Sequence, residues 1–165
     1  MNPESDFLRY SCEKLDQMRE RVDACVALLT AEQIWMRGGE TQNAIGNLLL
    51  HLNGNLQQWI LAGVGGIPIQ RDRDAEFSAR TGELPALGQT VAATVEVIRT
   101  LPHKRLTERV NIQKYDVTIL EAIYHVVEHS SGHTGQIILL TKAYTNRDLG
   151  FYSYLSGKQS VSSTP

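Results

Sequence analysis

The 165-residue chain is poor in cysteine, the residue that stabilises many secreted domains and builds many zinc sites. Its two cysteines, Cys12 and Cys25, do not form a CxxC pair and lie thirteen positions apart in one predicted helix. That separation along a helix is too large for a disulfide between them. We therefore expect two buried free thiols and a reducing, cytoplasmic environment.

Long apolar runs and a strong charge of one sign are also missing. No stretch approaches the roughly 20 apolar residues of a membrane-spanning helix, and the N-terminal MNPESDFLRY is charged where a signal peptide is apolar. The formal net charge of -2 provides no basic surface of the kind that binds nucleic acid. These absences argue against membrane and nucleic-acid partners.

The overall composition is that of a folded domain. Hydrophobic residues make up 42% of the chain and charged residues 21%, and the length suffices for one core without disulfides. We expect a single domain over residues 1–157. Residues 158–165 are polar and are expected to form a disordered tail.

Helical periodicity runs through most of the chain. Apolar residues recur at helical intervals in four segments, about 7–29, 42–62, 87–101 and 118–144. Between them, residues 67–84 look like a long connection with at most a short turn, and residues 106–117 like an extended segment or small hairpin. The pattern predicts an all-α protein with four long helices.

A row of three histidines in the last predicted helix is the most informative pattern. His125, His129 and His133 follow one another at intervals of four, so they lie along one stripe of the helix. Adjacent members of the row can chelate one metal ion, and imidazole nitrogens suit zinc, nickel, iron and manganese. A stable site needs a further donor from elsewhere in the chain.

His51 is the candidate for that donor. It lies in the most apolar predicted helix, where an unpaired imidazole costs free energy. Ligating imidazoles usually donate their second N–H to a polar group. The candidates for that role are Asn47, Asn55, Asp116, Glu121 and Glu128.

Four glycines also lie inside the helical patterns of these histidines. Gly46 and Gly54 flank His51, and Gly132 and Gly135 flank His133. Each glycine costs about 1 kcal/mol relative to alanine in a helix interior. We expect close packing between the two helices to offset this cost and to bring His51 towards the histidine row.

Two other interpretations of the histidines stay open. The sequence from His125 to His129 spells H-x-x-E-H, the inverted zinc-peptidase motif, in which Glu128 would be the general base. That motif leaves His51 and His133 without roles. Alternatively, the protein is a non-catalytic helical bundle, dimeric through one face, whose metal site is vestigial or adventitious. A cavity that leads from solvent to the histidines would favour an enzyme.

Two motifs, NLLLHLNGN at residues 47–55 and HVVEHSSGHTGQI at residues 125–137, resemble the DinB-like superfamily of metal-dependent bacterial proteins, also called YfiT-like. The resemblance covers roughly residues 5–155 and is to an uncharacterised branch. It implies a four-helix bundle with long crossover connections. It also implies that His51, His129 and His133 bind a divalent metal ion.

The resemblance has two further consequences. His125 aligns with a histidine that need not be a ligand, and the HHRGQ common in the superfamily is replaced here by GHTGQ at residues 132–136. Characterised relatives are thiol transferases and an isomerase that use low-molecular-weight bacterial thiols such as bacillithiol or mycothiol. Our hypothesis is metal-dependent S-transfer to a small-molecule substrate, or else hydrolysis, with Glu128 and Glu121 as proton acceptors.

Overall fold

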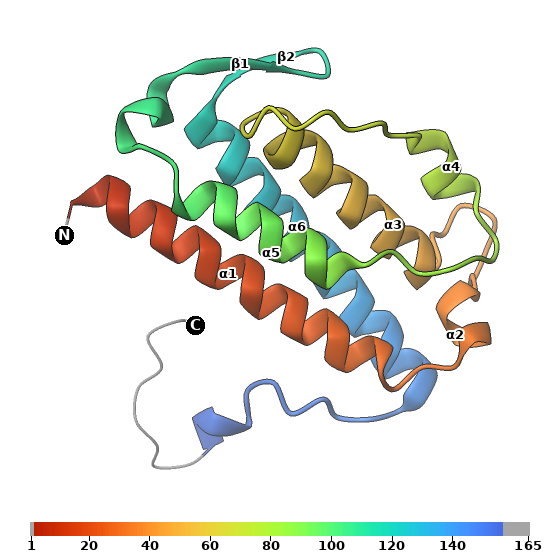
Figure 1. Cartoon of the computed structure of the whole chain (residues 1–165). Coiled ribbons are helices and arrows are strands. Elements are labelled where there is room, and N and C mark those ends of the chain that lie inside the picture. Colours follow the sequence, from red (N-terminus) through yellow and green to blue (C-terminus); the bar gives the residue numbers. More distant parts are fainter. Residues whose placement is uncertain (1, 157–165) are drawn as a thin grey trace.

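In the computed structural model, which describes residues 2–156, four long helices pack side by side (Figure 1). They are α1 (Pro3–Val26), α3 (Ile45–Leu56), α5 (Leu87–Arg99) and α6 (Ile119–Thr145). The helix α3 continues directly into a π-helical turn, η1 (Gln57–Ala62). The predicted all-α four-helix fold is confirmed. The tail expected over residues 158–165 lies outside the described residues.

Short elements occupy the connections between the long helices. These are α2 (Ala31–Trp35), α4 (Arg73–Ser78), the 3-10 helices η2 (His103–Thr107) and η3 (Ser153–Ser156), and the strands β1 (Arg109–Ile112) and β2 (Tyr115–Thr118). The two strands pair antiparallel, with Val110 opposite Val117, so of the two alternatives expected for residues 106–117 the structure has the small hairpin. The connection over residues 67–84 contains the short helix α4, where we expected no more than a turn.

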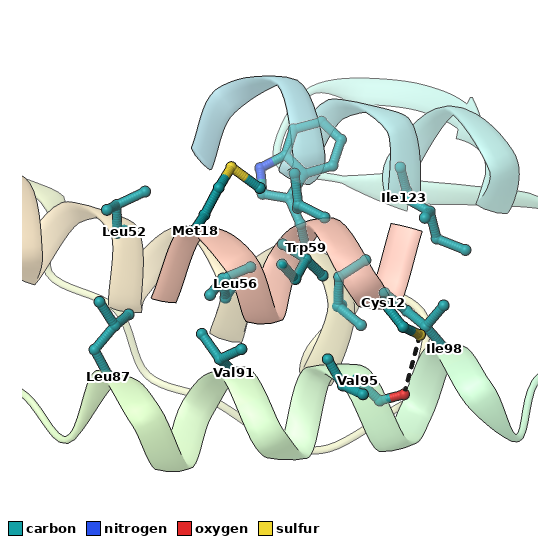
Figure 2. Close-up of a cluster of buried hydrophobic side chains, with 14 of the residues drawn as sticks. Cys12, Met18, Leu52, Leu56, Trp59, Leu87, Val91, Val95, Ile98 and Ile123 are labelled. Atoms are coloured by element: carbon teal, nitrogen blue, oxygen red, sulfur yellow. Dashed lines mark hydrogen bonds between the residues drawn. The ribbon is translucent and has the colours of Figure 1, made fainter. Parts of the chain in front are cut away.

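The long helices surround one core (Figure 2). The helix α1 packs against α5 and α6, and α3 packs against the same two helices from the other side. Cys12 and Cys25 are free and buried, as predicted, and Cys12 Sγ lies 3.7 Å from the carbonyl oxygen of Val95. Burial raises the pKa of the Cys12 thiol to about 11. Within residues 2–156, no helix combines the length and apolar character needed to span a membrane.

A crossover connection links α3 to α5. The two helices run in the same direction, so the chain between them has to return along the length of the bundle, and it does so over α3 with α4 on the way (Figure 1). The backbone of this connection is anchored by Asn47, whose Nδ2 donates to the carbonyl oxygens of Glu76 at 2.8 Å and Ala79 at 2.9 Å. The connection is therefore held against the first turn of α3.

The start of α6 is fixed by a capping box. Thr118 Oγ1 accepts a hydrogen bond from the Glu121 N–H at 3.2 Å, and Glu121 Oε2 accepts one from the Thr118 N–H at 2.7 Å. Reciprocal bonds of this kind satisfy two of the free N–H groups at a helix start. They set the register in which α6 presents its histidines.

Candidate metal centre

Three histidines from two helices converge beside the core. His51 of α3 lies with its Nε2 3.0 Å from Nε2 of His129 in α6, and the His133 ring centroid is 5.2 Å from that of His51 and 4.5 Å from that of His129. One ring nitrogen from each residue lies within 4.8 Å of the others. Three imidazoles gathered in this way can hold one divalent metal ion.

The imidazoles of α6 are in the protonation state that a metal requires. Burial, reinforced by the neighbouring histidines, lowers the pKa of His129 to about 3, and burial also lowers the pKa of His133. Both rings are therefore neutral at neutral pH. A neutral imidazole offers a nitrogen lone pair to a metal, whereas the protonated ring cannot.

Hydrogen bonds turn two of the three rings toward the centre. Nδ1 of His51 lies 2.9 Å from Oε2 of Glu76, and Nδ1 of His133 lies 2.7 Å from Oε1 of Gln136. Each Nδ1–H donates to that oxygen, so the lone pair of each of these two rings is on Nε2. This is the arrangement usual around metal-ligating imidazoles, and it raises their basicity.

Glu76 is itself held by Arg71 in a two-bond ion pair. Arg71 Nε donates to Oε1 at 2.6 Å and Nη2 donates to Oε2 at 2.8 Å, and both side chains are buried, at 6% and 9% exposed. Burial alone raises the pKa of the Glu76 carboxyl, but hydrogen bonds from Arg71 and His51 outweigh it and hold the pKa below its usual value. Glu76 is thus an ionised acceptor for the His51 N–H.

The side chains that we expected to bond to the ligating imidazoles have other partners. Asn47 anchors the crossover connection, Asn55 Nδ2 lies 3.5 Å from Nε2 of His125, Asp116 pairs with Arg109, and Glu121 caps α6. The residues that sequence reasoning missed, Arg71 and Glu76, come from the polar crossover connection. The signal that pointed to them was Gly54, because a Cβ there would lie 2.8 Å from Arg71 Nε.

The expected reason for the glycines is wrong. A Cβ on Gly46 would meet the ring of Trp35, and one on Gly54 would meet the Arg71–Glu76 pair, so neither glycine faces α6. Gly132 and Gly135 have nothing within 4 Å of an added Cβ. The helices α3 and α6 therefore bring their histidines together without glycine contacts between them.

A cavity of about 410 Å³ adjoins the histidines. Its wall includes His51, His129 and His125, together with Asn55, Trp59, Arg71, Arg73, Gln113, Tyr115, Val117 and Glu121. Trp59 belongs to η1, and π-helical turns occur frequently at functional sites. His125 packs on Trp59 with ring centroids 4.0 Å apart, but it is not among the three clustered donors. The cavity has the size of a small-molecule site.

The two carboxylates predicted as proton acceptors lie in different places. Glu121 lines the cavity, although its Oε2 is occupied by the cap of α6. Glu128 instead lines a separate groove between α1 and α6, beside Tyr10 and Tyr124. The structure therefore does not bring the glutamate of the H-x-x-E-H motif to the three clustered histidines.

Comparisons with known proteins agree with this fold. A family model described as "Protein of unknown function (DUF1572)" matches residues 2–158. A conserved protein of Enterococcus faecalis has a similar structure, with a TM-score of 0.66, 15% identity, and coverage of 84% of this chain and 97% of that one. A DinB-like protein of Bacillus cereus gives a TM-score of 0.58 at 17% identity, with 84% and 90% coverage. No curated protein matches the sequence. The fold is thus DinB-like.

Proposed function

Because the chain belongs to the DUF1572 family and has a DinB-like fold, we propose that it is a metalloenzyme with one divalent ion bound by His51, His129 and His133. The observation that carries the proposal is that three imidazoles, two of them oriented by Nδ1 hydrogen bonds, cluster beside a cavity whose wall includes His51 and His129. A purely structural site would be closed by a fourth protein ligand.

The donor set fits several metals. Three neutral imidazoles suit zinc or nickel best and also accommodate iron or manganese, and availability decides among them as much as affinity does. Among the described residues the cluster holds three donors, so a coordination position is left for water or substrate. An ion in this position lowers the pKa of a bound thiol or water, which supplies a nucleophile at neutral pH.

The reaction proposed first is S-transfer from a low-molecular-weight thiol to a small electrophile, with hydrolysis as the second choice. The protein's own thiols cannot serve as the nucleophile, since Cys12 and Cys25 are buried and their pKa values are raised by that burial. Trp59 and His125 form the wall that orients the substrate. We propose Glu121, which lines the cavity, as the proton acceptor, and no longer Glu128.

We further propose a cytoplasmic protein in which residues 1–157 act as one domain. Two free cysteines suit a reducing compartment. The homodimer anticipated from the sequence is likewise a proposal, and the mass in solution by light scattering tests it.

Metal content is the experiment that tests the proposed site. Untagged protein purified without chelators is expected to contain one ion per chain by mass spectrometry, and a His51→Ala, His129→Ala, His133→Ala variant is expected to contain none while keeping its helical circular dichroism. The matched control is His103→Ala, which removes an exposed histidine far from the cluster and should leave the metal in place. Absence of metal after exposure to zinc, nickel, iron and manganese would leave the non-catalytic bundle as the better interpretation.

A further inference from the structure

The charges around the cavity are almost balanced by the protein before any ion binds. The side chains of the wall that carry a full charge are Arg71, Arg73 and Glu121. The charge of Arg71 is cancelled by its buried partner Glu76. The pKa of Glu121 is lowered by its hydrogen bonds to Thr118, and its one negative charge equals in size the one positive charge of Arg73.

A bound divalent ion would therefore keep both of its positive charges. Its three ligands are imidazoles, which contribute no negative charge, and the buried carboxylate beside them, Glu76, is already paired with Arg71. Interactions between charges strengthen where the wall of a cavity excludes water. A thiolate at the open position neutralises one charge, and a second anionic group on the same molecule would neutralise the other.

Arg73 is the side chain available to receive that second group. It is exposed on α4 and lines the cavity, and its guanidinium lies over the Phe77 ring at 4.9 Å from the ring centroid. Among residues 2–156 it has no ion-pair partner, in contrast to the fully engaged Arg71, which also donates to Gln58 Oε1 at 2.7 Å. The planar guanidinium presents paired N–H groups that match a carboxylate.

The rest of the cavity wall is largely neutral. Trp59 and Tyr115 lie with ring centroids 6.1 Å apart, and Val117 adds an apolar surface beside them. Gln113, at the hairpin turn, is tied to Gln58 by a hydrogen bond of 2.6 Å. This surface suits the carbon skeleton that joins two anionic ends.

We propose that the substrate is a small anionic thiol, whose sulfur binds at the metal and whose carboxylate or equivalent anion contacts Arg73. The inference rests on the metal site proposed above and adds a charge requirement to it. On binding, the S–H proton would pass to solvent and the sulfur would take the open coordination position in place of water; no other bond would change.

The test uses protein loaded with cobalt(II), because a thiolate bound to cobalt gives a charge-transfer band in the near ultraviolet. Three thiols of matched length and different charge are titrated: 3-mercaptopropionate, 3-mercapto-1-propanol and 3-amino-1-propanethiol. Affinities are compared at equal thiolate concentration. The anionic thiol is expected to bind about fivefold or more tightly than the neutral one, as one partly exposed charge pair would provide, and the cationic thiol is expected to bind weakest.

The variant Arg73→Gln should remove the preference for 3-mercaptopropionate while leaving the affinity for 3-mercapto-1-propanol unchanged. Arg80→Gln, an exposed arginine of the same connection outside the cavity wall, is the matched control and should keep the preference. Equal affinities for the three thiols, or no band with any of them, would overturn the inference while the metal site stands. Failure of the protein to bind cobalt would overturn the proposed metal site and the inference together.

Discussion

Removing the Glu76 carboxylate should destabilise the protein and weaken the proposed metal site through two separate contacts. In Glu76→Ala the Arg71 guanidinium, 6% exposed, loses both bonds of its ion pair, and the His51 N–H loses its acceptor. Removing one partner of a buried ion pair costs about 3–5 kcal/mol. The remaining bond from Arg71 to Gln58 places the expected loss near the lower end of that range. For a chain of this size, the melting temperature should fall by roughly 6–12 °C.

A double variant separates the two effects. Arg71→Met together with Glu76→Met removes both charges and keeps similar volumes, and such replacements are often neutral or stabilising. Stability should therefore return to within about 1 kcal/mol of the wild type. The acceptor for the His51 N–H stays missing in this variant, so its affinity for zinc should remain about 10–100-fold weaker than that of the wild type.

The assays are urea unfolding of metal-free protein and competition for zinc with a chromophoric chelator. Glu83→Ala, which removes an exposed glutamate of the same connection, serves as the control and should change neither quantity. The reasoning is refuted if Glu76→Ala costs less than about 1 kcal/mol, below the range for a buried pair, or if the double variant binds zinc as tightly as the wild type.

Three more predictions concern glycine, pH and cysteine. Gly132→Ala should stabilise the protein by about 1 kcal/mol in urea unfolding, because the added Cβ meets nothing within 4 Å. Gly54→Ala should lose this gain, because its Cβ would lie 2.8 Å from Arg71 Nε; equal gains for both would contradict the packing described. Burial lowers the pKa of His129 to about 3. Between pH 6.5 and about 3, His129 therefore binds a proton in the unfolded chain but not in the native protein. Metal-free protein should thus lose stability as the pH falls through this window, and His129→Asn should show a smaller loss; parallel curves for the two proteins would count against the low pKa. Cys12, with its pKa raised to about 11, should react with a thiol-specific disulfide reagent at pH 7.5 only after unfolding, and rapid reaction of the native protein would show that it is accessible.

The fold was predictable because apolar residues recur at helical intervals in each long helix. The spacing of Val91, Val95 and Ile98 predicts the buried face of α5, and all three are buried. The interval of four in the histidine row predicts a common stripe on α6, and two of its members meet His51. Periodicity reports which residues of one helix share a face, so it works wherever the relevant partners are on the same helix.

The contacts of the crossover connection could not be predicted from periodicity. Arg71 and Glu76 lie in a polar stretch without apolar periodicity, and their contact with His51 depends on how the connection folds back over α3. Gly54 did mark a close approach, but the sequence did not identify the approaching group, which we took to be α6. Glu128 is the opposite case. The H-x-x-E-H match predicted a role for it beside the histidines, but it lies on the face of α6 that adjoins α1.

The proposed donors lie far apart in the sequence, and this separation bears on when an ion could be acquired during synthesis. His51 and its partner Glu76 leave the ribosome well before His129 and His133, which belong to the last long helix. That helix packs against α1, so the bundle closes only after α6 has been made. A nascent chain lacks the complete donor set, and binding linked to the native state stabilises only the finished fold. Ion binding at this site would accordingly follow the packing of α6 against α1 and α3.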